Sequence, residues 1–379
     1  MYQQNLSAAL QALHLETADL TALIEQKKES LKRFETQLRQ ENFPAFTICN
    51  TVENIDALQN IADGWKNAYE TVVFLGVGGS SLGAQTLVNF MGRFKKHNPE
   101  IILMDNVDPS SMENLLTGLN LATTGVVAVS KSGGTLETLA QTALFIQAFE
   151  AANIDVTKHI IGLSEETNNP LRNYLVHRHI PMLNHPMDVG GRFTLFTLVS
   201  LLPALLAGLN AEELRRGGAD ILTEFLENPE KHPASQAAAL SVLAAEKNVP
   251  MQVFMPYSDR LKTLSNWFVQ LWAESLGKDG QGTTPIPAVG STDQHSFLQL
   301  MMEGPNDKLI SILYTDAEAN ERTISSDEAT KIGQPVLNGL SLGKLLFNQA
   351  QGTADALISA GRPVRLFKLE KLNEYTLGG

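Results

Sequence analysis

The chain has 379 residues, of which 43% are hydrophobic and 18% charged, and its formal net charge is −12. These values are typical of a globular chain long enough for two or three domains, and they exclude a largely disordered protein. The negative charge argues against nucleic acid or an anionic membrane as a partner. Cys49 is the single cysteine, there is no signal-peptide pattern, and no apolar run is long enough to span a membrane, so we expect a cytoplasmic protein.

Residues 1–45 are expected to form an N-terminal helical segment. Between residues 5 and 40, leucines and other apolar side chains recur mostly at helical intervals with charged residues between them, which predicts one or two helices. We interpret the polar stretch Phe46–Asn54 that follows as a connector.

Strands and helices alternate from residue 71 onward. The predicted strands are Thr71–Leu75, Ile101–Met104, Val126–Val129, His159–Leu163, Ile180–Leu183, Met251–Met255, Leu309–Tyr314 and Val364–Lys368. The predicted helices include Gly83–Met91, Met112–Leu119, Phe193–Leu209, Ala237–Lys247, Leu261–Leu276 and Leu340–Ala360. Such alternation indicates parallel sheets with helices on both faces. We therefore predict an α/β fold with two doubly wound domains, residues 46–210 and 235–379, joined by a connector over residues 211–234.

The most informative stretch is the turn after the strand Val126–Val129. It reads SKSGGT over residues 130–135, and an apolar-periodic helix follows. A strand, turn and helix in this order point backbone N–H groups and the positive end of the helix dipole at one spot. The hydroxyls of Ser130, Ser132 and Thr135 lie beside that spot. The turn therefore suits a phosphate group; the alternative is an ordinary helix cap.

A second glycine-rich turn, GVGGSSLG at residues 76–83, follows the strand Thr71–Leu75. One interpretation is a dinucleotide-binding turn, because Asp105 ends the next strand, where a ribose-binding acid would lie. However, Ser81 takes the place of the usual third glycine, and Asp105 comes 29 positions after Gly76. Two parallel strands that each end in a Gly/Ser turn would instead converge on one small phosphorylated ligand.

The motif GGRFT at residues 190–194 places Arg192 at the start of an apolar helix. An arginine in such a position needs an anionic partner or a site to face. The sequence leaves two alternatives, a ligand anion or an ion pair with an acid such as Asp188.

Glu274 lies near the end of the predicted helix Leu261–Leu276. It follows Trp267 by seven residues and Leu271 by three, so it tends to share their inward face. A carboxylate partly buried there should have a raised pKa, the condition for a general base near neutral pH. Alternatively, Glu274 is a surface residue that pairs with Lys278 one turn later.

His295 ends a polar loop, STDQH at residues 291–295, that leads into an apolar helix. It is a candidate acid–base group or, alternatively, a hydrogen-bonding residue at a helix N-terminus. His177 and His179 flank Arg178, but no acidic or cysteine ligands accompany them at metal-binding spacing. We expect no metal site.

Together these motifs resemble the glucose-6-phosphate isomerase family. The resemblance covers roughly residues 45–379 and rests on five motifs in the family's order: GGSxLG at 78–83, SKSxxTxET at 130–138, GGRFT at 190–194, ESxGK at 274–278 and QHS at 294–296. It implies two sugar-isomerase (SIS) domains, a homodimer and no cofactor. It also implies interconversion of glucose 6-phosphate and fructose 6-phosphate through a cis-enediolate.

The resemblance further implies a role for each matching residue in sugar-phosphate binding. The residues that would hold the phosphate are Ser80, Ser130, Ser132 and Thr135, with Gly79 allowing the backbone to approach. Gln270 matches a substrate-contacting position one helical turn before Glu274.

Three residues would carry the chemistry. Glu274 would be the base that moves a proton between C2 and C1 of the open-chain sugar. Arg192 would stabilise the charge of the enediolate. His295 would assist ring opening and, in the family, reaches the site from the neighbouring subunit.

The resemblance stops before the family's C-terminal motif, [ND]QxGVExxK, whose Gln and Lys complete the site. The chain ends at Gly379, in what looks like the preceding segment, and Lys344 lacks the Asp-Gln that would have to precede it. We interpret the sequence as a truncated chain. If 379 residues is the natural length, ring opening should be impaired while proton transfer by Glu274 persists. The alternative function is a non-catalytic or impaired sugar-phosphate-binding protein.

Overall fold

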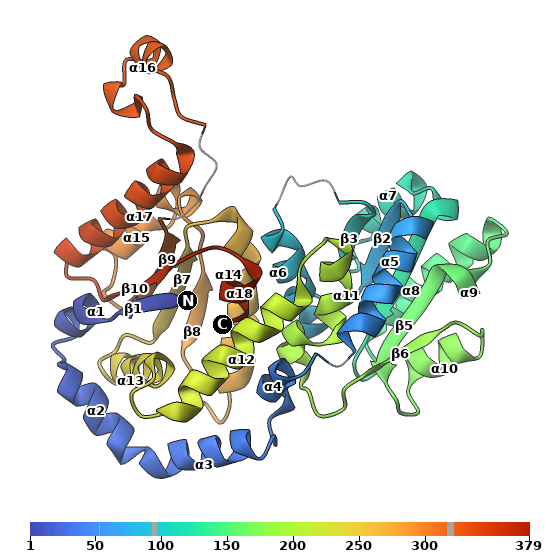
Figure 1. Cartoon of the computed structure of the whole chain (residues 1–379), viewed down its shortest axis with the longest axis horizontal. Coiled ribbons are helices and arrows are strands. Elements are labelled where there is room, and N and C mark those ends of the chain that lie inside the picture. The colour runs from blue at the N-terminus through green and yellow to red at the C-terminus, as the bar shows by residue number, and fades with distance from the viewer. Residues whose placement is uncertain (53, 93–96, 317–321) are drawn as a thin grey trace. The chain divides into compact units, whose positions relative to one another are not determined.

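The computed structural model describes residues 1–52, 54–92, 97–316 and 322–379 (Figure 1). The chain forms two compact units: unit 1 combines Met1–Gln40 with Gly217–Gly379, and unit 2 comprises Glu41–Arg216. Within the described residues, each unit contains one five-stranded sheet. The N-terminal segment is thus part of unit 1.

Unit 2 is built on a parallel sheet with the strand order β3–β2–β4–β5–β6. Its strands are β2 (Thr71–Leu75), β3 (Glu100–Met104), β4 (Thr124–Val129), β5 (Ile160–Glu165) and β6 (Met182–His185). β4 is buried along its whole length, as expected of a strand covered on both faces. The doubly wound parallel arrangement predicted for this part of the chain is confirmed.

Helices precede and follow these strands. They are α4 (Pro44–Thr47), α5 (Ile55–Ala68), α6 (Leu82–Phe90), α7 (Pro109–Gly118), α8 (Leu136–Ala151), α9 (Val156–His159), α10 (Pro170–Val176) and α11 (Leu198–Leu206). The predicted single helix Phe193–Leu209 is wrong, because a 3-10 helix, Gly191–Phe196, precedes α11. The hydroxyl of Thr197 accepts a hydrogen bond from the N–H of Val199, so this residue begins a new helix.

Unit 1 has a mixed sheet with the strand order β1–β10–β9–β7–β8. Its strands are β1 (Tyr2–Asn5), β7 (Met251–Pro256), β8 (Thr284–Pro287), β9 (Lys308–Thr315) and β10 (Val364–Leu369). Only β1, at one edge, runs antiparallel to its neighbour among these strands. The two edge strands were not predicted, because β1 is polar and β8 contains two prolines, which are tolerated only at an edge.

The helices of unit 1 include the N-terminal ones. They are α1 (Ser7–Ala12), α2 (Thr17–Gln26), α3 (Lys28–Arg39), α12 (Ala211–Glu227, which starts in unit 2), α13 (Pro233–Glu246), α14 (Lys262–Leu276), α15 (Leu298–Glu303), α16 (Ser326–Ile332), α17 (Leu342–Ser359) and α18 (Glu374–Gly378). Leu10, Leu20 and Ile24 share a buried cluster with Leu240 and Leu309. This packing joins the N-terminal helices to the sheet of unit 1.

Candidate active site

Two turns of unit 2 leave the sheet at the same edge. β2 and β4 are neighbours, and Leu75 is aligned with Ala128, so the turns that start at Gly76 and Ser130 both follow the carboxyl ends of adjacent parallel strands. Each turn leads into a helix, α6 or α8. In the described structure neither N-cap residue, Ser81 or Thr135, caps its helix with its side chain, and the N-terminus of a helix is where an anion binds best.

The glycine turn packs tightly against the segment that carries Arg192. A Cβ atom at Gly79 would lie 2.0 Å from the carbonyl oxygen of Gly191. The hydroxyl of Thr194 donates a hydrogen bond of 2.5 Å to the carbonyl oxygen of Gly79. Gly79 therefore allows a close approach of two backbone segments. This contact brings Arg192 to the edge where the glycine turn begins.

The hydroxyls of the second turn differ in their surroundings. Ser130 is buried, and its Oγ donates to Thr135 Oγ1 at 2.9 Å and accepts from the Thr135 N–H at 3.4 Å. Ser132 is exposed, and its Oγ accepts from the Gly134 N–H at 3.3 Å. Ser130 thus braces the turn, whereas Ser132 and the half-buried Thr135 are reachable from solvent. Ser80, in the glycine turn, is also half-buried.

Arg192 lies within the 3-10 helix Gly191–Phe196 and is half-buried. Its guanidinium carbon lies 4.6 Å from the centre of the Phe193 ring. This cation–π contact helps to orient the planar group.

Asp105, the candidate ribose-binding acid, has a partner on α6. Its Oδ2 accepts a hydrogen bond of 2.7 Å from the Gln85 side chain, which also donates to Ser81 Oγ at 2.9 Å. The acid therefore serves to join β3 to α6, which counts against the dinucleotide interpretation.

In unit 1, α14 carries two of the predicted site residues, Gln270 and Glu274. Gln270 Nε2 donates a hydrogen bond of 3.3 Å to Glu274 Oε2. Within the described part of the chain, the buried Oε1 of Gln270 accepts no hydrogen bond. An amide oxygen in this condition gains a partner when a hydroxyl-bearing ligand binds.

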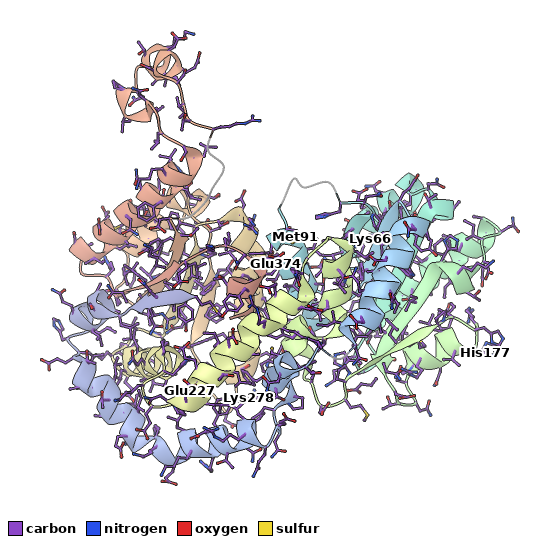
Figure 2. The ribbon with its side chains drawn as sticks, viewed as in Figure 1. Lys66, Met91, His177, Glu227, Lys278 and Glu374 are labelled. Atoms are coloured by element: carbon purple, nitrogen blue, oxygen red, sulfur yellow. The ribbon has the colours of Figure 1, made fainter. Side chains whose placement is uncertain are left out.

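Glu274 is exposed, so of the two alternatives that the sequence left open, the inward-facing, partly buried carboxylate is wrong and the surface residue fits. The reason is that Trp267 and Leu271, taken as markers of the inward face, are themselves only half-buried. The ammonium group of Lys278 (Figure 2) donates to the carbonyl oxygens of Glu274 and Ser275, at 2.8 Å each, and so caps the helix.

His295 is exposed at the end of the 3-10 helix Thr292–His295. The residues before it are anchored: Gln294 Nε2 donates to Tyr257 Oη at 2.7 Å, and Asp293 Oδ2 accepts from the Val289 N–H at 2.7 Å. The imidazole is thus presented from a fixed backbone.

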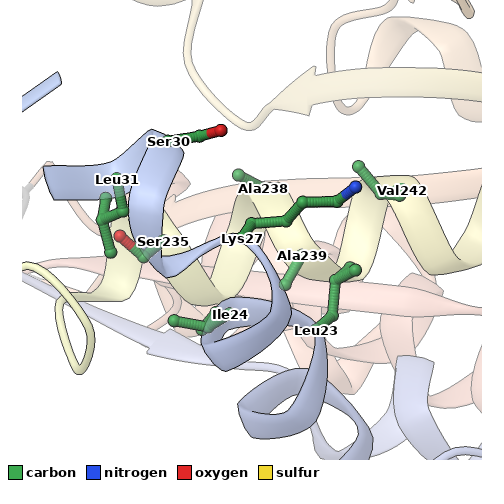
Figure 3. Close-up of a pocket in the computed structure, with 9 residues that line it drawn as sticks. All are labelled: Leu23, Ile24, Lys27, Ser30, Leu31, Ser235, Ala238, Ala239 and Val242. Atoms are coloured by element: carbon green, nitrogen blue, oxygen red, sulfur yellow. The ribbon is translucent and has the colours of Figure 1, made fainter. Parts of the chain in front are cut away.

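A pocket of about 220 Å³ lies in unit 1 between the N-terminal helices and α13 (Figure 3). Its lining is mostly apolar and consists of Leu23, Ile24, Lys27, Ser30, Leu31, Ser235, Ala238, Ala239 and Val242. None of the predicted site residues lines it, and its surface does not suit a sugar phosphate. Over the described residues, no group of three His, Cys, Asp or Glu side chains is placed to hold a metal ion, and no helix is long and apolar enough to cross a membrane.

Two residues near the predicted site were missed. Arg215 is buried, and its guanidinium donates to the carbonyl oxygens of Thr51 and Phe196 at 2.9 Å each, which ties α12 to the Arg192 segment. Asn169 caps α10, accepting from the Arg172 N–H at 2.9 Å beside the second turn. The pair Asn169-Pro170 is a helix-start signal that was available in the sequence, whereas nothing in the sequence distinguishes Arg215.

Comparison with known proteins gives consistent matches. A family model described as phosphoglucose isomerase matches residues 48–332. A probable glucose-6-phosphate isomerase of Haloquadratum walsbyi is 34% identical over 90% of this chain and 78% of that protein. A glucose-6-phosphate isomerase of Rubrobacter xylanophilus is 35% identical over 89% of this chain and 81% of that protein. The crystal structure of a hypothetical protein from Thermus thermophilus matches the whole chain and 90% of that protein, with a TM-score of 0.88 at 29% identity.

Proposed function

The chain belongs to the phosphoglucose isomerase family, and we propose that it interconverts glucose 6-phosphate and fructose 6-phosphate as an aldose–ketose isomerase. The observation that carries this function is the extent of the family match. Residues 48–332 include every predicted site residue, from Gly79 in the glycine turn to His295. Relatives that share about a third of their residues over most of this chain are named as the same enzyme.

The phosphate-binding part of the proposed site is the sheet edge of unit 2. The N–H groups at the starts of α6 and α8 and the hydroxyls of Ser80, Ser132 and Thr135 would hold the phosphate. Ser130 would act by bracing Thr135. Because the chain carries a net charge of −12, this local arrangement of donors has to attract the anion against the overall field.

The proton-transfer part of the proposed site is α14. In the open-chain aldose, the Glu274 carboxylate removes the proton from C2, a C1=C2 double bond forms, and negative charge develops on O1. The guanidinium of Arg192 would stabilise that charge, a contribution of roughly 3 kcal/mol for an interaction of this kind. The O2 proton then moves to O1, so that the negative charge passes to O2. As the C2=O2 bond forms, Glu274 returns its proton to C1, which completes the ketose. Gln270 would hold the carboxylate and accept a sugar hydroxyl at its Oε1.

We also propose that the enzyme is a homodimer in which His295 serves the neighbouring site and assists ring opening. The support for the dimer is an arm of unit 1, between Ile324 and Leu340, that carries α16 and projects from the sheet of that unit in Figure 1. The arm is closed by hydrogen bonds from the Ile324 N–H to Leu340 O and from the Gly339 N–H to Ile324 O. Ile332 and Val336 are 56% and 75% exposed on it, which suits burial against a second copy.

The dimer is tested by light scattering of the wild type and of Val336→Asp. The expected result is a dimer mass for the wild type and a shift towards monomer for the variant; a monomeric wild type contradicts the proposal. The proposed setting is the cytoplasm, a reducing compartment in which the buried thiol of Cys49 stays reduced.

The activity is tested by supplying fructose 6-phosphate in deuterated water and measuring glucose 6-phosphate. Turnover with deuterium at C2 of the product is expected, because the proton held by Glu274 exchanges with solvent. Binding of fructose 6-phosphate without turnover would instead favour the alternative of a non-catalytic sugar-phosphate-binding protein.

A further inference from the structure

The turn of residues 130–135 lies against the end of the next strand, β5, and against the start of α10. Backbone hydrogen bonds join the two: from Ser130 N–H to Leu163 O at 3.0 Å, from Glu165 N–H to Lys131 O at 2.9 Å, and from Leu171 N–H to Gly133 O at 2.9 Å. The pairing of β4 with β5 therefore continues into the turn, beyond the end of β4 at Val129. The shape of the turn depends on the segment of residues 163–171.

At Gly133 the turn is in direct contact with the segment of residues 163–171. Its φ of +67° is in the left-handed region, and a Cβ atom at this position would lie 1.8 Å from Asn169 Oδ1. The Asn169 side chain thus fills the space beside Gly133. Neither residue is free to shift without the other, because both are buried.

The Asn169 side chain also makes hydrogen bonds within residues 163–171. Its side-chain nitrogen lies 3.1 Å from Glu165 O and 3.2 Å from Thr167 O, while its Oδ1 caps α10. It is 4% exposed, so breaking these hydrogen bonds leaves buried polar groups without partners. A further link is the ion pair of Lys131 Nζ with Glu165 Oε1 at 3.4 Å.

We propose that Asn169 is a positioning residue for the sugar-phosphate site. It holds residues 163–171 in the shape that fixes Gly133, and thereby sets the N–H groups and hydroxyls of the turn without touching the substrate. This inference rests on the proposed function. It predicts that loss of the Asn169 amide weakens phosphate binding and leaves proton transfer at Glu274 largely unchanged.

The test uses Asn169→Ala, Asn169→Asp and, as a matched control, Asn168→Ala. Asn168 is the exposed neighbour, whose Oδ1 accepts from the Asn173 side chain at 2.6 Å. Asn169→Asp keeps the oxygen that caps α10 but loses the donors to Glu165 O and Thr167 O. For each protein, KM for fructose 6-phosphate, kcat, and the inhibition constant of inorganic phosphate are measured.

The expected result is a rise of about tenfold or more in KM and in the phosphate inhibition constant for both Asn169 variants, with kcat changed less than about threefold. The control should match the wild type. A loss of folded protein alone would lower kcat per total enzyme and leave KM unchanged. Wild-type KM in Asn169→Ala or in Asn169→Asp overturns the proposal, as does an equal effect of Asn168→Ala.

Gly133→Ala approaches the same contact from the other side, so the proposal is testable even if the Asn169 variants fail to fold. A raised KM is expected, because the added methyl group collides with the Asn169 amide. A wild-type KM in Gly133→Ala would overturn the proposal. Failure of the proposed function is distinguishable from both results, because it would appear as a wild-type protein without isomerase activity.

Discussion

Gln270 Nε2 donates a hydrogen bond of 3.3 Å to Glu274 Oε2, so the amide and the carboxylate are held together one helical turn apart on α14. Glu274 is exposed, and this bond is a local constraint on its orientation. Because Gln270 on the same helix orientates Glu274, the proposed base does not have to be buried to be held in position. The sequence left a buried and a surface position open for Glu274, and the structure shows a surface carboxylate that is orientated by Gln270.

Glu274→Gln should abolish proton transfer while keeping the size of the side chain. We expect kcat to fall by about 100-fold or more, with KM for fructose 6-phosphate within about threefold of the wild type. Glu246→Gln, at the exposed end of α13, is the matched control and should be fully active. An unchanged kcat for Glu274→Gln would exclude Glu274 as the base.

Ser130→Ala and Ser132→Ala should differ in their effect on stability. Ser132 is exposed, so its loss should raise KM for fructose 6-phosphate about three- to tenfold with an unchanged melting temperature. Ser130 is buried and bonded to Thr135, so its loss should raise KM and also lower the free energy of unfolding by about 1 kcal/mol. Equal melting temperatures for the two variants would contradict the bracing role of Ser130.

Gly79→Ala should separate the glycine turn from the Arg192 segment. The added methyl group would meet the Gly191 carbonyl oxygen at 2.0 Å, and this oxygen belongs to the backbone. We expect a loss of about 1–3 kcal/mol in the free energy of unfolding and a marked loss of kcat/KM. Gly64→Ala is the control: a Cβ there meets nothing within 4 Å in the exposed middle of α5, so it should stabilise the protein by up to about 1 kcal/mol. Wild-type activity in Gly79→Ala would refute the close contact.

The stability of unit 1 should fall on acidification because of His232. Burial lowers the pKa of this imidazole below its ordinary value of 6.5, and its Nδ1 caps α13 by accepting from the Ala234 N–H at 3.2 Å. Below that ordinary value the unfolded chain binds more protons than the folded one, so the free energy of unfolding decreases as the pH falls. His232→Asn keeps a capping oxygen and removes the titration. Urea unfolding at about pH 7.5 and about pH 5 should show a smaller loss for the variant; an equal loss in both proteins would exclude this role.

Much of the architecture followed from local pattern. Among the described residues, apolar runs bounded by polar turns predicted β2 to β5 of unit 2 and the three inner strands of unit 1, because a strand covered on both faces must be apolar along its length. The prediction for β6, Ile180–Leu183, begins two residues too early, since the strand is Met182–His185. The turns after β2 and β4 were predicted to bind phosphate for a similar reason. A phosphate-binding turn needs glycine and hydroxyl residues within a few positions of a helix start, and such spacing is visible in a sequence.

The sequence by itself therefore determined the fold class, through short-range spacing, and the family, through the order of its motifs, and it named the residues that are proposed to carry the chemistry. Only the tertiary structure decided that residues 1–40 join unit 1, that Glu274 is exposed, that Gly79 approaches Gly191 and that Asn169 packs beside Gly133. These relationships join segments distant in the chain or depend on how much of a helix face is covered. They arise from packing and burial, which no local pattern of residues records.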